Sequence, residues 1–395
     1  MHTDNIRPPF PLLKFLVLPD LFLAAVLAIG LPKWARVIYL LGFVGLTYRG
    51  LQYSTGPDKM QDYAMGSTLG GQLFTAIHLL LLAEPIIQYR HFSDTDDPQK
   101  RSFLRRVYWA ACIIHSPRGI GWNYEVSHVP PRPAVSHGSF ICSRLFRILV
   151  FFFFIDAAQT FRRINPLFSL SDAVLETASV TSQGFLLRCP NIIAWMAIPY
   201  AGVQLQYHLI SVISVALGFS MPSDWPAPYG RWSDAYTVRD FWGRTWHQML
   251  RRYASSIGKF VSQAAGFKRG SFGSSYMQLI MGFCVSGLMH IFGDAMVEWR
   301  YLGSSLSFFL AQPVAIVTED AVIGIFRRAD MKLHPLVCRS IGYAWVFAWL
   351  NMSFPWYIDW ALRAGLGRGD LLPVTPLWSL LNFWKEGKGL DTIFS

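Results

Sequence analysis

Long apolar runs without charged residues are the main pattern along this chain. Residues 192–219, 274–293 and 340–358 contain no Asp, Glu, Lys or Arg and are rich in aliphatic and aromatic side chains. A helix needs about 20 apolar residues to cross the hydrocarbon core of a bilayer. We therefore predict a membrane-spanning helix in each of these runs.

Further runs are apolar but shorter, or are interrupted by ionisable side chains: 15–31, 37–48, 69–87, 148–160 and 301–326. They raise the expected total to about seven to nine spans. Ionisable groups at membrane depth are costly and usually face a bundle interior or a wet cavity. Asp20, His78, Glu84, Glu319 and Asp320 in these runs therefore indicate an enclosed polar chamber. The expected fold class is an all-α integral membrane protein, a polytopic bundle of helices.

Two polar stretches, 88–144 and 220–272, separate the apolar runs. Neither is long or apolar enough to form a separate soluble domain with its own core. We expect residues 1–395 to form a single membrane domain.

Composition supports a bilayer as the solvent of this chain. Hydrophobic residues make up 52% and charged residues only 15% of the 395 residues, which is too little polar surface for a soluble globule. The 35 Lys and Arg exceed the 24 Asp and Glu by +11, an excess typical of cytoplasmic loops that face anionic lipid. Nucleic acid is therefore not an expected partner. The five cysteines form no CxxC pair, so we expect neither a metal site nor a disulfide framework.

The first candidate for chemistry is the sequence DFWGRTWHQMLRR in the second polar stretch. A helix here would place Arg244, His247 and Arg251 on one face, with Trp242 and Trp246 beside them. Such a cationic, aromatic ridge could hold the phosphates of a nucleotide-bearing carrier, because Arg pairs with phosphate in a fixed fork. An interfacial helix, with Trp at the headgroups and Arg toward anionic lipid, is the alternative.

The second candidate is His290, at the end of SGLMH inside the charge-free run 274–293. A histidine at this depth is often only a hydrogen-bonded packing residue. Kept neutral by burial, it could instead act as a general base toward an alcohol. His78 and His208 also lie in apolar segments, so depth alone does not distinguish His290.

The two motifs in this order resemble the paired signature of the wax-synthase-like branch of the membrane-bound O-acyltransferases. RGIGW, residues 118–122, is similar to a motif of the fungal members that acetylate terpenoid and meroterpenoid alcohols. The resemblance covers residues 110–300, and the core it implies extends over residues 110–360. It implies interfacial helices and an internal tunnel within the bilayer, in a multi-pass protein of the endoplasmic reticulum.

The resemblance implies that His290 is the catalytic histidine and that His247 takes the family's upstream Asn or His position. His290 would take the proton of a bound hydroxyl, the alkoxide would attack the thioester of acyl-CoA, and the thiolate would leave. His247 would either stabilise the tetrahedral oxyanion or orient the thioester. Plant-type relatives carry Glu after the second motif, whereas Ile291 follows here and Asp294 comes one turn later.

The resemblance also implies substrates and their contacts. Arg244, Arg251 and Arg252 are candidates for the CoA phosphates, and Trp242 and Trp246 for the entry of the carrier. No permanently bound cofactor is expected. The co-substrate is acyl-CoA, in the first place acetyl-CoA, and the acceptor is a lipophilic terpenoid or meroterpenoid alcohol of secondary metabolism. Long-chain wax ester synthesis is the alternative within the family.

Other classes of function make different demands on the sequence. A membrane prenyltransferase needs two aspartate-rich motifs for magnesium, and only the partial motif Asp94-Thr-Asp96-Asp97 is present. A terpene cyclase would use Glu84, Glu319 or Asp320 as a buried acid. A transporter would show internal repeats and broken helices, which we do not detect in the sequence.

Overall fold

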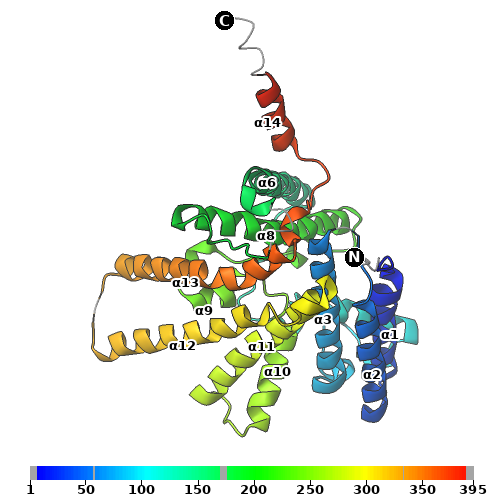
Figure 1. Cartoon of the computed structure of the whole chain (residues 1–395). Helices are drawn as coiled ribbons and strands as arrows, with labels where there is room; N and C mark the ends of the chain where they lie inside the picture. The colour runs from blue at the N-terminus through cyan, green and yellow to red at the C-terminus, as the bar shows by residue number, and fades with distance from the viewer. Residues whose placement is uncertain (1–6, 57, 170–175, 332, 388–395) are drawn as a thin grey trace, which may run out of the picture. The chain divides into compact units, whose positions relative to one another are not determined.

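The computed structural model describes residues 7–56, 58–169, 176–331 and 333–387. All regular secondary structure in these residues is helical, and the only β-type pairing there consists of two isolated bridges. The predicted all-α class is therefore confirmed for the described chain (Figure 1).

The chain divides into two compact units. Unit 1 combines Met1–Pro131 with Tyr229–Tyr357, and unit 2 combines Arg132–Pro228 with Ile358–Ser395. Unit 1 contains α1 (Leu18–Ile29), α2 (Lys33–Gly50), α3 (Lys59–Ile77), α4 (Pro85–Gln88), α5 (Phe103–Ile114), α9 (Val238–Asp240), α10 (Arg251–Ala264), α11 (Phe272–Val297), α12 (Leu306–Arg328) and most of α13 (Pro335–Arg363). Unit 2 contains α6 (His137–Ile164), α8 (Phe185–Ala216), the end of α13 and α14 (Pro376–Gly387). The single membrane domain expected from the sequence concerns both units together and stays a prediction.

Within the described residues, four helices are long and apolar enough to cross a membrane. They are Lys59–Leu82, His137–Ile164, Phe272–Val297 and Trp299–Arg328. The third confirms the predicted span 274–293, and the others contain or overlap the weaker runs 148–160, 301–326 and 69–87.

The remaining predicted spans are also helical but less apolar or shorter. Residues 192–216 lie in α8 and 340–358 in α13, where Gln, Tyr, Trp and Pro side chains interrupt the apolar run. The runs 15–31 and 37–48 lie in and around α1 and α2. The total of seven to nine spans and the internal tunnel stay predictions.

Short polar side chains begin three of the long helices. Asp58, Ser136 and Ser271 each accept a hydrogen bond from a backbone N–H in the first turn of α3, α6 and α11. The first N–H groups of a helix have no partner within it, so such caps stabilise its start by about 1 kcal/mol. The start of each helix is therefore encoded locally.

Glycines bring α3 and α11 into direct backbone contact (Figure 1). A Cβ atom on Gly66 would lie 2.3 Å from the carbonyl oxygen of Phe292, and one on Gly70 would lie 2.8 Å from that of Met289. Small residues four apart on one helix allow this close approach, which favours association of helices in membranes. The contact places the α3 side chains beside Gly66 against the C-terminal turns of α11.

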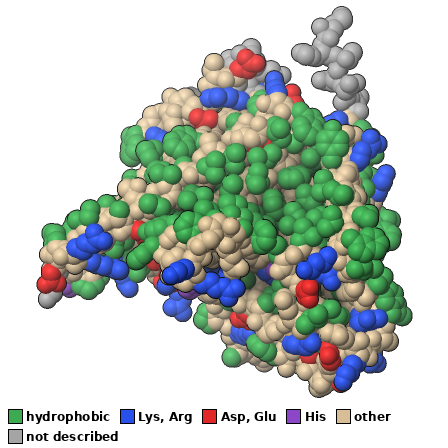
Figure 2. Space-filling view, turned by 90° about the horizontal axis from the view of Figure 1, so that it is seen from below, with side chains coloured by type: hydrophobic (Ala, Val, Ile, Leu, Met, Phe, Trp, Pro, Cys, Tyr) green, Lys and Arg blue, Asp and Glu red, His purple; other side chains and the backbone are tan. Residues whose placement is uncertain are grey.

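Apolar side chains are exposed over much of the surface, as on the face shown in Figure 2. Leu104 and Leu186 are 77% and 87% exposed, for example. A soluble monomer rarely exposes apolar patches of this extent, whereas lipid tails would cover them in a bilayer. The surface agrees with a membrane protein.

Candidate active site

His290 lies on α11 with one ring nitrogen bonded and the other open. Its Nδ1 is 2.9 Å from the hydroxyl of Tyr63 and 3.4 Å from that of Ser67, both on α3. The ring of Phe309 stacks on the imidazole at a centroid distance of 4.6 Å and an angle of 11°. Within the described chain, Nε2 makes no hydrogen bond and is not among the fully buried polar atoms. The protein therefore orients the ring and leaves Nε2 accessible.

A chain of hydrogen bonds continues from Tyr63 to a buried carboxylate. The hydroxyl of Tyr357 donates to the hydroxyl of Tyr63 at 2.7 Å. The Ser305 hydroxyl lies 3.3 Å from the same Tyr63 hydroxyl. Ser305 in turn donates to Asp294 with its hydroxyl and, at 2.9 Å, with its backbone N–H. Asp294 and Ser305 are both fully buried. The carboxylate one turn after His290 is thus connected to it through two hydroxyl groups.

The region around His247 differs from the helix assumed from the sequence. After α9, residues Phe241–Thr245 form a single π-helical turn, Trp246 is extended, and α10 begins only at Arg251. The carbonyl oxygen of Thr245 accepts a hydrogen bond from Gly230 N–H at 2.9 Å and so does not continue a helix. The expected helical face of Arg244, His247 and Arg251 is therefore wrong, because a tertiary backbone bond ends the helix.

His247 lies on this loop with a buried, unsatisfied ring nitrogen. Its Nδ1 has no hydrogen-bond partner in the part of the chain that the structure describes. Tyr229 and Trp246 contact the ring, both at centroid distances of 5.7 Å. Burial, and to a lesser degree the positive charge of Arg118, lowers the pKa of His247 to about 4. His247 is close enough to interact electrostatically with His290 and is neutral at physiological pH.

Glu319 on α12 anchors the start of the His247 loop. Its carboxylate accepts hydrogen bonds from the backbone N–H groups of Val238 and Arg239, at 2.7 and 3.4 Å, and from Trp345 Nε1 at 2.9 Å. Asp320 forms an ion pair with Arg239. These two carboxylates, which a cyclase would need as acids, are occupied in holding the loop.

The arginines expected to bind CoA have different surroundings. Arg244 is exposed and forms an ion pair with Asp240 at 2.9 Å. Arg251 is half-buried and donates to the carbonyl oxygen of Gly243 and to Gln248 Oε1, each at 2.7 Å. Of these two, Arg244 has its guanidinium in the open.

Arg252 points into unit 1. It is 7% exposed and donates to the carbonyl oxygens of Ile113 and Ser116, at 2.9 and 3.4 Å. Its guanidinium also lies over the ring of Tyr124, 5.1 Å from the centroid. These contacts tie α10 to the end of α5.

Trp242 and Trp246 contact each other at a centroid distance of 5.7 Å. Trp242 donates from Nε1 to Gln312 on α12 at 3.0 Å and packs edge-on against Phe283 of α11. Both tryptophans are partly buried, so they join the His247 loop to the helices that carry the other site residues.

The RGIGW motif forms a tight loop that requires its glycines. Gly119 and Gly121 have φ angles of 64° and 80°, and a Cβ atom on Gly121 would lie 2.5 Å from His91 Nε2. Trp122 is buried in the core of unit 1. The motif therefore shapes the loop that brings the buried Arg118 near His247.

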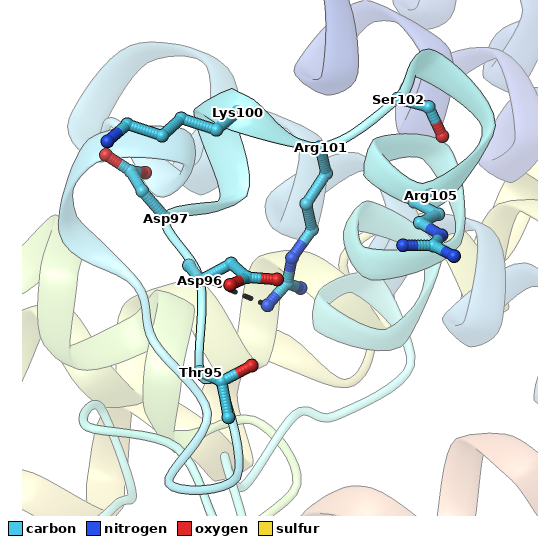
Figure 3. Close-up of a pocket in the computed structure, with 7 residues that line it drawn as sticks. All are labelled: Thr95, Asp96, Asp97, Lys100, Arg101, Ser102 and Arg105. Atoms are coloured by element: carbon cyan, nitrogen blue, oxygen red, sulfur yellow. Dashed lines mark hydrogen bonds between the residues drawn. The ribbon is translucent and has the colours of Figure 1, made fainter.

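Carboxylates of the acidic turn Asp94–Asp97 pair with arginines and accept hydrogen bonds from backbone N–H groups. Asp94 pairs with Arg101 at 2.8 Å, and Asp97 pairs with Arg90 at 3.1 Å. The turn borders a surface pocket that side chains of both charge signs line (Figure 3). No group of three His, Cys, Asp or Glu side chains suited to a metal occurs in the described ranges.

Comparisons of the sequence with known proteins identify the family of this chain. A sequence model of the "Membrane bound O-acyl transferase family" matches residues 225–311, which include His247 and His290. A model of the "Aspirochlorine biosynthesis protein F C-terminal domain" matches residues 136–216. The acetyltransferase ple2 of Rhodocybe pseudopiperita is 32% identical over 90% of this chain and 92% of the relative. The chain belongs to the membrane-bound O-acyltransferase family.

Other relatives of this membrane-bound O-acyltransferase are also acetyltransferases by name. The acetyltransferase eriL of Hericium erinaceus is 31% identical over 85% of this chain and 86% of the relative. The acetyltransferase spyB of Aspergillus fumigatus is 27% identical over 87% of this chain and 63% of the relative. No solved structure matches the chain. The family resemblance and the membrane acetyltransferase class predicted from the sequence are confirmed.

Tyr63, Tyr357 and Ser305 around His290 were not predicted from the sequence. Tyr63 lies before the predicted span 69–87, because Lys59 and Asp62 shorten the apolar run. The available signal was the small-residue pair of α3, Gly66 and Gly70, which indicates a helix contact. It does not indicate which helix is the partner.

Proposed function

We propose that this acetyltransferase transfers the acetyl group of acetyl-CoA to the hydroxyl of a lipophilic alcohol, with His290 as the general base. The observation that supports this most is the state of the His290 ring, with Nδ1 bonded to Tyr63 and Nε2 open. A general base must hold its lone pair toward the proton it removes, within about 3 Å in the productive complex. The helix α11 and the stacked Phe309 keep the ring in one orientation.

The reaction begins with transfer of the alcohol proton to His290 Nε2. The alcohol oxygen forms its bond to the thioester carbonyl carbon, and the carbonyl electrons move to oxygen. When the tetrahedral intermediate collapses, the C–S bond breaks and CoA leaves as a thiolate of pKa about 8 to 9. The thiolate takes up the proton held by His290, so that the products are an acetate ester and CoA thiol.

His247 stabilises the tetrahedral oxyanion in this proposal. A neutral imidazole carries one N–H. Nδ1 of His247 is buried and has no partner in the described residues, so in this proposal it becomes the donor when bound substrate opens the site to it and charge develops on the oxyanion. Removing one such donor costs about 2 to 4 kcal/mol in other acyl-transfer sites.

The CoA phosphates bind on the side of the His247 loop. Arg244 is exposed and pairs with one carboxylate, Asp240, within the described ranges, so it is the first candidate, and Arg251 is the second. Arg252 stabilises the fold, because backbone carbonyls already accept from its guanidinium. Trp242 and Trp246 form the wall at the entry of the carrier.

The acceptor is a terpenoid or meroterpenoid alcohol of secondary metabolism. The resemblance of the RGIGW motif to fungal members with such acceptors supports this class, as does the membrane itself, which dissolves apolar alcohols. The endoplasmic reticulum is the proposed location, with the alcohol entering from the bilayer and CoA from the basic, aqueous side.

One experiment tests the proposed function directly. Microsomes with the wild type or His290→Ala are incubated with radiolabelled acetyl-CoA or palmitoyl-CoA and a panel of terpenoid and fatty alcohols. We expect acetyl esters of terpenoid alcohols from the wild type and a loss of at least about 100-fold in the variant. Equal acetylation by His290→Ala would refute the mechanism, and a preference for palmitoyl-CoA and fatty alcohols would identify a wax ester synthase.

A further inference from the structure

The hydrogen bonds around Tyr63 restrict where its single proton points. Tyr357 donates to the Tyr63 oxygen, and the same hydroxyl lies within hydrogen-bond distance of His290 Nδ1 and Ser305 Oγ, to either of which it can donate. If Tyr63 donates to Nδ1, the neutral imidazole must carry its own proton on Nε2. That tautomer presents no lone pair at the accessible nitrogen.

The opposite arrangement satisfies every group in the chain. His290 donates from Nδ1–H to the Tyr63 oxygen, and Tyr63 donates to Ser305 Oγ. Ser305 donates to Asp294 Oδ1, and the carboxylate only accepts. The sequence of donors therefore has one direction, from His290 to Asp294, and it leaves the Nε2 lone pair free.

We propose that Tyr63, Ser305 and Asp294 form a positioning relay that holds His290 in the tautomer with its proton on Nδ1 and its lone pair on Nε2. The inference rests on the proposed function, since it assumes that His290 is the base. It extends that function to residues of α3, of α11 and of the segment before α12, none of which touches the reacting atoms.

The relay also stabilises the imidazolium that forms when His290 takes the alcohol proton. The new positive charge strengthens the donation from Nδ1–H, and the two hydroxyl groups polarise toward the carboxylate. No proton has to move along the relay, because the proton on Nε2 returns to the CoA thiolate. The same separation of roles, a base and a group that orients it, occurs in hydrolase triads.

Burial strengthens the interaction of the Asp294 charge with His290 through the two hydroxyl groups, because water does not screen it. Asp294 and Ser305 have no exposed surface, and no Lys or Arg in the described part of the chain pairs with Asp294. Its charge is compensated by the two donors of Ser305 and by the backbone N–H of Gly303. The titratable groups facing His290 are Tyr63 of α3, Tyr357 of α13, Asp294 of α11 itself and His247 of the loop.

The test measures kcat and KM for acetyl-CoA in detergent, with the terpenoid alcohol that the wild type acetylates fastest. Tyr63→Phe and Asp294→Asn should each lower kcat about 10- to 100-fold and leave KM within about twofold, since outer partners of a functional histidine typically act on this scale. The matched control is Tyr253→Phe, which removes a buried hydroxyl bonded to the sulfur of Met289, next to His290. It should keep the wild-type kcat.

Tyr357→Phe separates the relay from general packing. Tyr357 bonds to Tyr63 but does not connect it to Asp294, so its loss should lower kcat less than that of Tyr63→Phe. If Tyr63→Phe does not fold, Ser305→Ala and Ser305→Thr decide, because only the second keeps the hydroxyl and should restore kcat.

The outcomes distinguish the relay from the proposed function. Wild-type kcat in Tyr63→Phe and Asp294→Asn, with an inactive His290→Ala, would overturn the relay alone. A rise of KM together with a lower unfolding temperature in all relay variants would also overturn it, since that result indicates a structural role. An active His290→Ala would overturn the proposed function itself.

Discussion

The two histidines of the site lie in regions built in opposite ways. His290 lies within the C-terminal half of a long helix, with Nδ1 bonded and its ring stacked on Phe309. His247 lies on a loop, with Nδ1 buried and without a hydrogen-bond partner among the residues that the structure describes. A base has to be oriented before the substrate arrives, whereas a donor for an oxyanion has to wait for a charge that does not yet exist. In the proposed mechanism, this difference in hydrogen bonding suits His290 to the role of base and His247 to the role of donor.

The supports of the two regions differ as well. The His290 region depends on the close contact of α3 and α11 at Gly66 and Gly70. The His247 loop depends on one buried carboxylate, Glu319, and on the bond from Gly230 to Thr245. Changes on the helices should therefore affect catalysis through the tautomer and orientation of the His290 ring. Changes on the loop should affect it through the position of the His247 ring.

Among changes in the His247 loop, the largest effect is expected from His247→Ala. Loss of the oxyanion donor should cost about 2 to 4 kcal/mol, which is roughly a 30- to 1,000-fold lower kcat. His247→Asn is the matched variant, because its amide N–H can replace Nδ1–H and should recover part of the activity. Steady-state acetylation rates measure both. Equal rates for Ala and Asn would show that His247 is not a donor.

The free energy of unfolding should depend on pH through His247, which an exposed histidine with an ordinary pKa would not cause. The pKa of His247 is about 4 in the folded protein and 6.5 when exposed, so the unfolded chain binds more protons between these values. The free energy of unfolding should therefore fall by about 3 kcal/mol as pH decreases from 6.5 to 4. Thermal unfolding of the wild type and His247→Asn in detergent measures this. If the difference in free energy of unfolding between the wild type and His247→Asn does not change with pH, the His247 ring is not buried as described.

Glu319→Gln tests whether the loop is held as described. The amide retains the shape but loses the charge that accepts from Val238 and Arg239, which should cost about 1 to 3 kcal/mol of stability. We expect a lower unfolding temperature and an acetylation rate reduced less than in His247→Ala. Glu298→Gln, an exposed carboxylate paired with Arg300, is the control and should leave both unchanged. Complete loss of product in folded Glu319→Gln would favour a catalytic acid.

The smallest effect is expected from Arg244→Ala. Loss of one exposed cation at the CoA phosphates should raise KM for acetyl-CoA roughly tenfold at low salt, with kcat unchanged. Arg300→Ala removes a cation with a similar ion pair elsewhere and should leave KM unchanged. Kinetics at two salt concentrations provide the check. A KM that does not change in Arg244→Ala would place the phosphates elsewhere.

Hydrophobic pattern was sufficient to predict part of the fold. The run 274–293 and the weaker run 301–326 lie in helices that are long and apolar enough to span a membrane. The pattern was weaker for α3, because the charged residues near its start shortened the apparent span and left Tyr63 outside it. Periodicity also suggested a helix through His247, which the bond between Gly230 and Thr245 prevents. Local pattern cannot include a partner from elsewhere in the chain.

The sequence by itself determined the membrane class and the helical content, because both depend on residue type and short-range spacing. The resemblance of their motifs to the membrane-bound O-acyltransferases singled out His247 and His290. Only the tertiary structure decided that Tyr63, Ser305, Asp294 and Tyr357 surround His290, and that Arg252 faces inward. Such contacts join residues up to 294 positions apart, as between Tyr63 and Tyr357. They form because glycines let two helices approach and because buried polar groups must find partners, and neither condition can be read from one segment alone.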